Sequence, residues 1–140
     1  MTHPYFGAMK WNEEFKQYEV KWKVERHSFQ LNIPMEGVAD QAAVLGIAQE
    51  FCKDLATWHE QAKDYAAKEL LELKNDTWLD EDEKEVNATE FKKKMRLENL
   101  EIHADGNFDF WFADGDLFWG HSIIVSGNIK SGFTQAEIAG

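Results

Sequence analysis

Apolar and polar side chains alternate along the first third of the chain, which is the period of a half-buried β-strand. Between Phe15 and Val24 the apolar positions fall on one face, and charged residues occupy the other face. A second alternating run covers residues 29–33 and ends at Pro34, which cannot continue a sheet ladder. An aromatic-rich run over residues 5–11 precedes both. The pattern therefore predicts three N-terminal strands in a meander.

From Val38 the apolar spacing changes to three or four residues, which is the period of an amphipathic helix. The pattern continues to about residue 74, and one straight helix of that length would overhang a compact domain of this size. Thr57 and Glu60 fit a capping box, in which the two side chains satisfy free N–H groups at a helix start. We therefore predict a break near Thr57, while the periodicity leaves open whether residues 38–74 form one helix or two.

An acidic loop and a short helix are predicted to follow. Residues 75–86 crowd acidic side chains together without a sustained apolar period, which is typical of a loop. Asn87 and Glu90 form a second capping box. The helix that it opens is predicted to end at about Met95.

Strands return in the last third of the chain. The predicted strands are Leu100–Ile102, Phe108–Phe112 and Ser122–Ser126, with turns at Asp105-Gly106, Gly127-Asn128 and Ser131-Gly132. Asp105-Gly106 is the strongest hairpin signal, because both central positions of a type I′ turn need positive φ. Strands, helices and strands in this order predict one α+β domain over residues 1–140. We expect a mainly antiparallel sheet of about six strands, three N-terminal and three C-terminal, with two main helices packed on one face.

Composition narrows the function classes. The 140 residues include 26 acidic and 15 basic side chains, a formal charge of −11, which disfavours binding to nucleic acid or to an anionic membrane surface. Residues 38–86 hold thirteen of the acidic and five of the basic residues, so most of the excess lies in the predicted helices and acidic loop. Cys52 is the only cysteine and is predicted to be a buried thiol. With no disulfide and no apolar leader or spanning run, a cytoplasmic location is predicted.

The densest cluster of chemically active side chains lies between two predicted strands, at residues 114–122. Asp114, Asp116 and His121 are the candidate catalytic or metal-binding residues, because carboxylate and imidazole groups share metal ions or protons. The alternative is a structural turn, in which Asp and Gly supply tight backbone geometry and His121 bonds locally. No established catalytic motif or nucleotide-binding loop is present, and we predict no cofactor.

Six tryptophans raise the question of a binding surface. Most of them occupy apolar positions, where core packing is expected, whereas Trp111 lies opposite the predicted Phe face of its strand. The candidate binding residues are Asn75, Trp78, Trp111 and Trp119. The remaining histidines are interpreted as surface or locally bonded residues, namely His3, His27, His59 and His103.

The run from Asp105 to Ile123, with its segment DGDLFWGHS, resembles the signature of a bacterial family, domain of unknown function 2262. The similarity includes Asn75–Trp78 and covers roughly the C-terminal 80 residues well. The resemblance implies a small bacterial protein, cytoplasmic, with an α+β fold. It supplies no catalytic residues or cofactor.

These observations favour a non-enzymatic acidic domain that binds a basic protein partner, in its most concrete form an immunity-like inhibitor of a toxin. This hypothesis predicts acidic side chains gathered on one exposed face. One alternative is a metal-dependent or acid/base enzyme that uses Asp114, Asp116 and His121. Another is a structural or oligomerisation module built on the aromatic strands. The sequence does not predict the oligomeric state.

Overall fold

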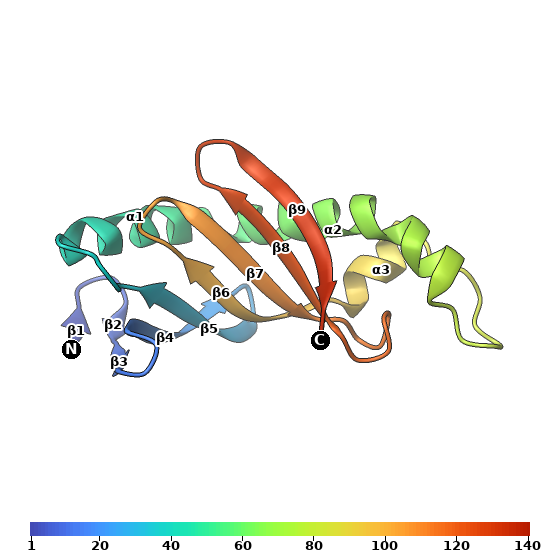
Figure 1. Ribbon diagram of the computed structural model, residues 1–140, viewed down its shortest axis with the longest axis horizontal. Helices are drawn as coiled ribbons and strands as arrows, with labels where there is room; N and C mark the ends of the chain where they lie inside the picture. The colour runs from blue at the N-terminus through green and yellow to red at the C-terminus, as the bar shows by residue number, and fades with distance from the viewer.

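The computed structural model describes residues 1–140, which form an α+β structure with nine strands and three helices (Figure 1). Seven strands form one sheet in the order β3-β4-β5-β6-β7-β8-β9, and β1 and β2 form a separate hairpin. The elements are β1 (Thr2–His3), β2 (Gly7–Ala8), β3 (Lys10–Asn12), β4 (Gln17–Val24), β5 (His27–Pro34), α1 (Gln41–Lys53), α2 (Leu55–Thr77), α3 (Ala88–Lys94), β6 (Arg96–Ile102), β7 (Asn107–Ala113), β8 (Ser122–Asn128) and β9 (Gly132–Ala139).

The predicted sheet is right in outline and differs in two details. It has seven strands, and it is mixed because β5 and β6 pair in parallel while all other neighbours are antiparallel. The parallel pair arises because all three helices lie between β5 and β6, so the chain returns to the sheet after a long crossover. The first predicted strand, over residues 5–11, is divided between two short strands, β2 and β3, and a further short strand, β1, precedes it.

The long helical segment consists of two helices that run along the length of the molecule (Figure 1). They are separated at Asp54, so the predicted break is confirmed and lies three residues before Thr57. The carbonyl of Asp54 accepts hydrogen bonds from the N–H groups of Thr57 and Trp58, which places Thr57 inside the first turn of α2. The capping box at Asn87 and Glu90 forms as predicted and opens α3.

The C-terminal hairpins depart from the predicted turns. Only Gly106 of the Asp105-Gly106 pair has positive φ, at 88°, so the turn is not type I′. The carbonyl of His103 instead accepts a hydrogen bond from the Gly106 N–H, and the His103 N–H donates to the carbonyl of Asn107, which closes the turn before β7. Gly127 lies within β8, and a Cβ there would be 2.5 Å from the Gly132 carbonyl oxygen, so the absence of a side chain permits the close approach of β9.

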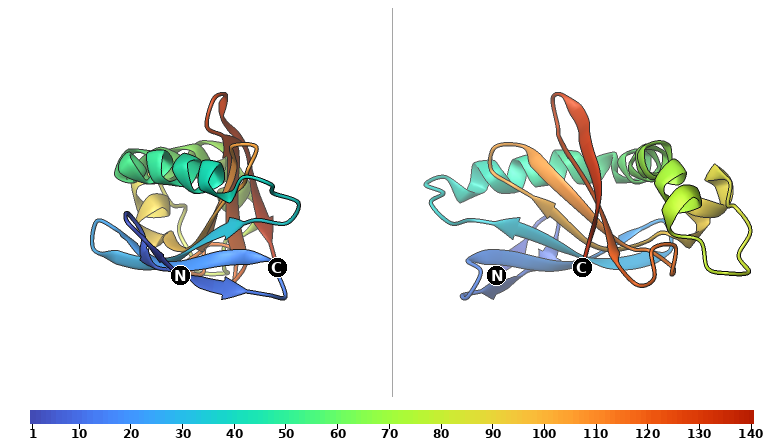
Figure 2. Two further views of the ribbon diagram at one scale, coloured as in Figure 1. Left: turned by 90° about the vertical axis from the view of Figure 1, so that its left-hand side faces the viewer. Right: turned by 45° about the vertical axis from the view of Figure 1, so that its right-hand side comes forward.

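The hydrophobic core lies between the helices and one face of the sheet (Figure 2). Phe108, Phe110 and Phe112 project from β7 toward α1 and α2 and are fully buried. Phe51 of α1 contacts the first two of these rings. Cys52 is buried beside Phe51, and burial raises the pKa of its thiol to about 12.

None of the three helices combines the length and the apolar composition that a membrane span requires.

Candidate functional site

The face of the sheet that the helices leave uncovered carries polar and half-buried side chains. On β7 the residues that alternate with the buried phenylalanines are Asp109, Trp111 and Ala113, all of which are partly exposed. Trp111 borders a hollow of about 320 Å³, together with Asn32, Asn99 and Glu101 from β5 and β6. Trp111 therefore lies on an open face, apart from the other candidate binding residues.

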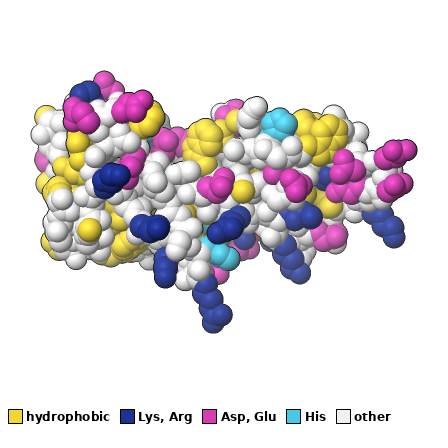
Figure 3. All heavy atoms as spheres, turned by 90° about the horizontal axis from the view of Figure 1, so that it is seen from below, with side chains coloured by type: hydrophobic (Ala, Val, Ile, Leu, Met, Phe, Trp, Pro, Cys, Tyr) yellow, Lys and Arg dark blue, Asp and Glu magenta, His cyan; other side chains and the backbone are white.

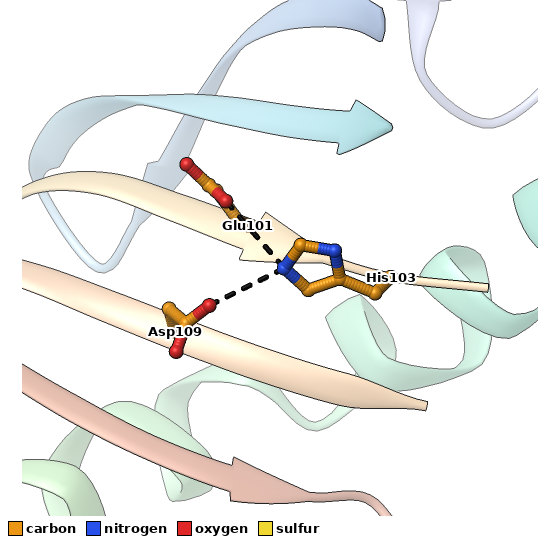
Figure 4. Close-up of side chains that lie close together, drawn as sticks. All are labelled: Glu101, His103 and Asp109. Carbon is orange, nitrogen blue, oxygen red and sulfur yellow. Dashed lines mark hydrogen bonds and ion pairs between the residues drawn. The ribbon is translucent and has the colours of Figure 1, made fainter. Parts of the chain in front are cut away.

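Three titratable side chains converge on this open face. Glu101 and Asp109 lie directly opposite each other on β6 and β7, and His103 follows just beyond the end of β6. The Nε2 atom of His103 lies 3.2 Å from Asp109 Oδ2 and 3.5 Å from Glu101 Oε2 (Figure 4). One ligand atom from each of the three residues lies within 4.8 Å of the others. We call Glu101, His103 and Asp109 the Glu-His-Asp cluster.

Local charges fix the protonation of the cluster. The hydrogen bond to Asp109, followed by that to Glu101, raises the pKa of His103 to about 10, so the imidazole is charged at neutral pH. The same hydrogen bond from His103 lowers the pKa of Asp109, and the hydroxyl of Ser126 contributes to this by donating to Asp109 Oδ1 at 2.6 Å. Asp109 is therefore held from both sides.

A hollow of about 470 Å³ adjoins the cluster. His103 and Asp109 form part of its wall, together with polar side chains from β7, β8, β9 and the turns that precede β7 and β9. These residues are Asp105, Asn107, Ser126, Asn128, Ser131 and Thr134. Small polar molecules and water thus have direct access to the cluster.

The loop over residues 114–121 has a different construction, because the carboxylate of Asp114 organises it from inside. Asp114 is 4% exposed. Its Oδ1 accepts a hydrogen bond from the Asp116 N–H, and its Oδ2 accepts bonds from the N–H groups of Phe118, Gly120 and His121, at 2.9–3.2 Å. With both oxygens engaged by backbone, Asp114 has the role of a loop clamp.

Asp116 and His121 point to separate surroundings. Asp116 is exposed and has a left-handed backbone, with φ of 67°. His121 bonds to the carbonyl of Phe118 through Nδ1 and contacts the ring of Trp78. The only group of three potential metal ligands that the structure brings together is the Glu-His-Asp cluster, so Asp114, Asp116 and His121 do not form one.

Trp78 and Trp119 join the two sequence segments that carry the family resemblance. Their rings meet edge to face with centroids 4.8 Å apart, and Trp119 Nε1 donates to the Trp78 carbonyl at 3.1 Å. Trp78 also packs against the core, whereas Trp119 is 53% exposed. The backbone of Trp119 is left-handed, with φ of 58°, which is an unfavourable conformation for a bulky side chain.

The loop between α2 and α3 is fastened by two consecutive polar residues at the end of α2. Lys74 is fully buried and donates from Nζ to the carbonyl of Trp78 at 2.8 Å and to Glu83 at 2.9 Å. Asn75 makes a pair of hydrogen bonds to the backbone of Val86, at 2.9 and 3.0 Å. The candidate binding residue Asn75 is therefore a loop anchor, close in the chain to Trp78.

The structure thus brings together Asn75, Trp78, Trp119 and His121 at one end of the molecule and places Trp111 elsewhere. Sequence reasoning missed the Glu-His-Asp cluster, since His103 was interpreted as a surface or locally bonded residue without a role in a site. The signal was present, because Glu101 and His103 are two positions apart at the end of one strand and Asp109 follows across a predicted hairpin.

The comparisons with known proteins identify a family without an assigned activity. Neither the curated proteins nor the solved structures contain a match to this chain. A family described as uncharacterized proteins conserved in bacteria, DUF2262, matches residues 3–138. The match extends well beyond the C-terminal segment that carried the resemblance and includes both loops and the Glu-His-Asp cluster. The chain belongs to this bacterial family, DUF2262.

Proposed function

We propose that this protein is a non-enzymatic binding domain that receives a basic, arginine-bearing segment of a protein partner at its acidic end. The acidic end is the surface formed by residues 78–87 and the neighbouring loop, residues 114–121. The carrying observation is Trp119, which is half exposed although its left-handed backbone costs free energy for a bulky residue. An exposed aromatic side chain held at such a cost is typical of a contact residue.

The charge around Trp119 supports a basic partner. Residues 80–85 read DEDEKE, and all but Glu83 are exposed. In the view from below, acidic side chains crowd the tip that carries this loop, whereas acidic and basic side chains are interspersed over the rest of that face (Figure 3). A local negative field at one tip steers a positively charged segment toward it and fixes the orientation of binding.

The acidic end is also fixed before any partner arrives. Lys74 and Asn75 hold the α2–α3 loop from inside, and Asp114 holds the loop that presents Trp119. Loops that are already ordered lose little conformational entropy on binding, so more of the contact energy appears as affinity.

Arginine matches this surface better than lysine does. A guanidinium group can lie flat on the Trp119 ring while its N–H groups pair with carboxylates of the loop, and the aromatic contact alone contributes about 0.5–2 kcal/mol. A basic toxin with arginines around its active site is one protein of this kind, and an immunity-like domain would cover it.

The test measures binding of a fluorescently labelled arginine-rich peptide by anisotropy, followed by recovery of the natural partner from a bacterial host. The variants are Trp119→Ser and the double variant Glu81→Gln/Asp82→Asn. The native side chains of Glu81 and Asp82 make no hydrogen bonds within the protein, so the double variant changes charge alone. The matched control is Glu14→Gln/Glu36→Gln, which removes the same charge from exposed positions in the N-terminal third.

We expect both acidic-end variants to weaken binding at least about fivefold relative to the control variant, consistent with loss of about 1 kcal/mol. Affinity should also fall steeply with added salt. If the control variant weakens binding as much as the acidic-end variants do, attraction is due to net charge alone and the proposal fails. Retention of the natural partner by Trp119→Ser would count equally against it.

A further inference from the structure

We propose that Glu101, His103 and Asp109 bind one divalent transition-metal ion on the open face of the sheet. The site lies at the end of β6 and near the start of β7, whereas the 114–121 loop follows the other end of β7, and the proposal is independent of partner binding at the acidic end. Glu101 and Asp109 come from two neighbouring strands, which set their separation through the sheet register, and His103 follows directly after β6. Side chains on rigid strands provide better-fixed metal ligands than side chains on loops.

The distances fit a small ion with nitrogen and oxygen ligands. An ion bound to imidazole nitrogen and carboxylate oxygen at about 2.0–2.1 Å in tetrahedral geometry keeps its ligand atoms about 3.3 Å apart. His103 Nε2 lies 3.2 Å from Asp109 Oδ2 and 3.5 Å from Glu101 Oε2. The two carboxylates need to approach each other, and Glu101 is free to turn because its side chain is 31% exposed.

The direction of the imidazole ring supports an ion at this position. Both carboxylates face the same nitrogen, Nε2, as Figure 4 shows, although a single N–H group can point well at only one acceptor. A cation in the position of that proton would satisfy all three atoms as ligands. The ion would displace the Nε2 proton of the charged imidazole into solvent, and the two carboxylates and the resulting neutral imidazole would then balance the charge of a divalent ion.

The surroundings resemble those of a metal ligand set. The hydroxyl of Ser126 donates to Asp109 Oδ1, which leaves Oδ2 directed at His103 and supplies the outer hydrogen bond that orients a metal-binding carboxylate. The adjoining hollow of about 470 Å³ leaves room for water or an exchangeable ligand to complete the coordination. A mixed imidazole and carboxylate set suits Zn²⁺, Mn²⁺ or Fe²⁺ better than Mg²⁺ or Ca²⁺, which prefer oxygen alone.

The test is isothermal titration calorimetry of the unaltered 140-residue protein with Zn²⁺, with Mg²⁺ as the comparison ion. We expect one Zn²⁺ per chain and no measurable Mg²⁺ binding. His103→Gln and Asp109→Asn should abolish Zn²⁺ binding, and Ser126→Ala should weaken it about tenfold. The matched controls are His27→Gln and Asp76→Asn, which alter an exposed His and an exposed Asp outside the cluster and its hollow and should leave binding unchanged.

A second measurement keeps the result clear if a cluster variant folds poorly. In the unaltered protein, Zn²⁺ should shift the NMR resonance of His103 Nε2 and leave that of His121 in place. No Zn²⁺ binding, binding that survives in correctly folded His103→Gln, or a shift at His121 alone would each overturn the proposal. The cluster would then be an ion-paired network that stabilises the β6–β7 hairpin.

Discussion

Replacement of Asp114 by alanine tests whether the loop at residues 114–121 is held by one buried carboxylate. The substitution removes the acceptor of four backbone hydrogen bonds, from the N–H groups of Asp116, Phe118, Gly120 and His121. The free energy of unfolding should therefore fall well beyond the effect of an ordinary surface substitution.

The magnitude follows from the burial of the four donors. The Phe118 N–H belongs to a fully buried residue, and leaving it unpaired costs roughly 2 kcal/mol. The other three donors lie in exposed or half-buried residues, where water can replace the carboxylate, so each loses roughly 0.5–1 kcal/mol. Asp114→Ala should thus destabilise the protein by about 4 kcal/mol, a large share of the stability of a domain of this size.

The assay is urea denaturation followed by tryptophan fluorescence, with Asp114→Asn and Asp116→Asn as companions. Asp114→Asn keeps one acceptor oxygen and should lose about half as much stability. Asp116→Asn changes an exposed side chain without hydrogen bonds and should stay within about 0.5 kcal/mol of the unaltered protein. A loss below about 1.5 kcal/mol for Asp114→Ala would refute the clamp, because the loop would then be held by other contacts.

Three other predictions test the core and the loop anchor. Burial lowers the pKa of His59 from 6.5 to about 4, so the unfolded chain binds a proton at a higher pH than the folded protein does. The free energy of unfolding should therefore decline by up to about 3 kcal/mol as pH falls between those values, and His59→Leu should flatten this decline in thermal melts recorded across the pH range. Gly127→Ala should lower the free energy of unfolding by about 2–4 kcal/mol in urea denaturation, because its Cβ would meet a carbonyl oxygen at 2.5 Å. Gly46→Ala, whose Cβ would lie in open space on α1, should raise it by about 0.5–1 kcal/mol, and equal effects of the two substitutions would contradict the packing argument. Lys74→Met should lower the free energy of unfolding by about 2–3 kcal/mol and, because Glu83 loses its ion-pair partner, should make the α2–α3 loop more susceptible to limited proteolysis. Unchanged proteolysis would show that Lys74 does not hold the loop.

Elements with strong local patterns could be predicted from the sequence. Apolar and polar residues alternate over the whole length of β4, and the Asn87–Glu90 capping box depends only on two side chains three positions apart. Both therefore form where expected. The β9 strand was missed because its apolar positions are small or irregularly spaced and its pairing depends on close contact at Gly127. The parallel pairing of β5 with β6 is a long-range choice that no local pattern specifies.

The Glu-His-Asp cluster was missed because of an error of one residue in the hairpin. A two-residue turn at Asp105-Gly106 would place Glu101 opposite Phe110 and mix the polar and apolar faces. The actual turn is longer and pairs Glu101 with Asp109 and Ile102 with Phe108. Because a shift of one position exchanges the two faces of a strand, requiring the apolar faces to match would have found the register and the cluster with it.

The single parallel ladder has a kinetic consequence. It joins Gln30, Leu31 and Asn32 to residues 99–101 across the three helices, whereas each of the other ladders joins strands that have no helix between them. Local pairings close short loops, but this one must close a loop that contains every helix, and the entropy cost of that closure precedes any gain from contact. We therefore expect amides of β7 and β8 to be protected early in pulsed hydrogen exchange, and those of β5 only when the two halves of the sheet meet.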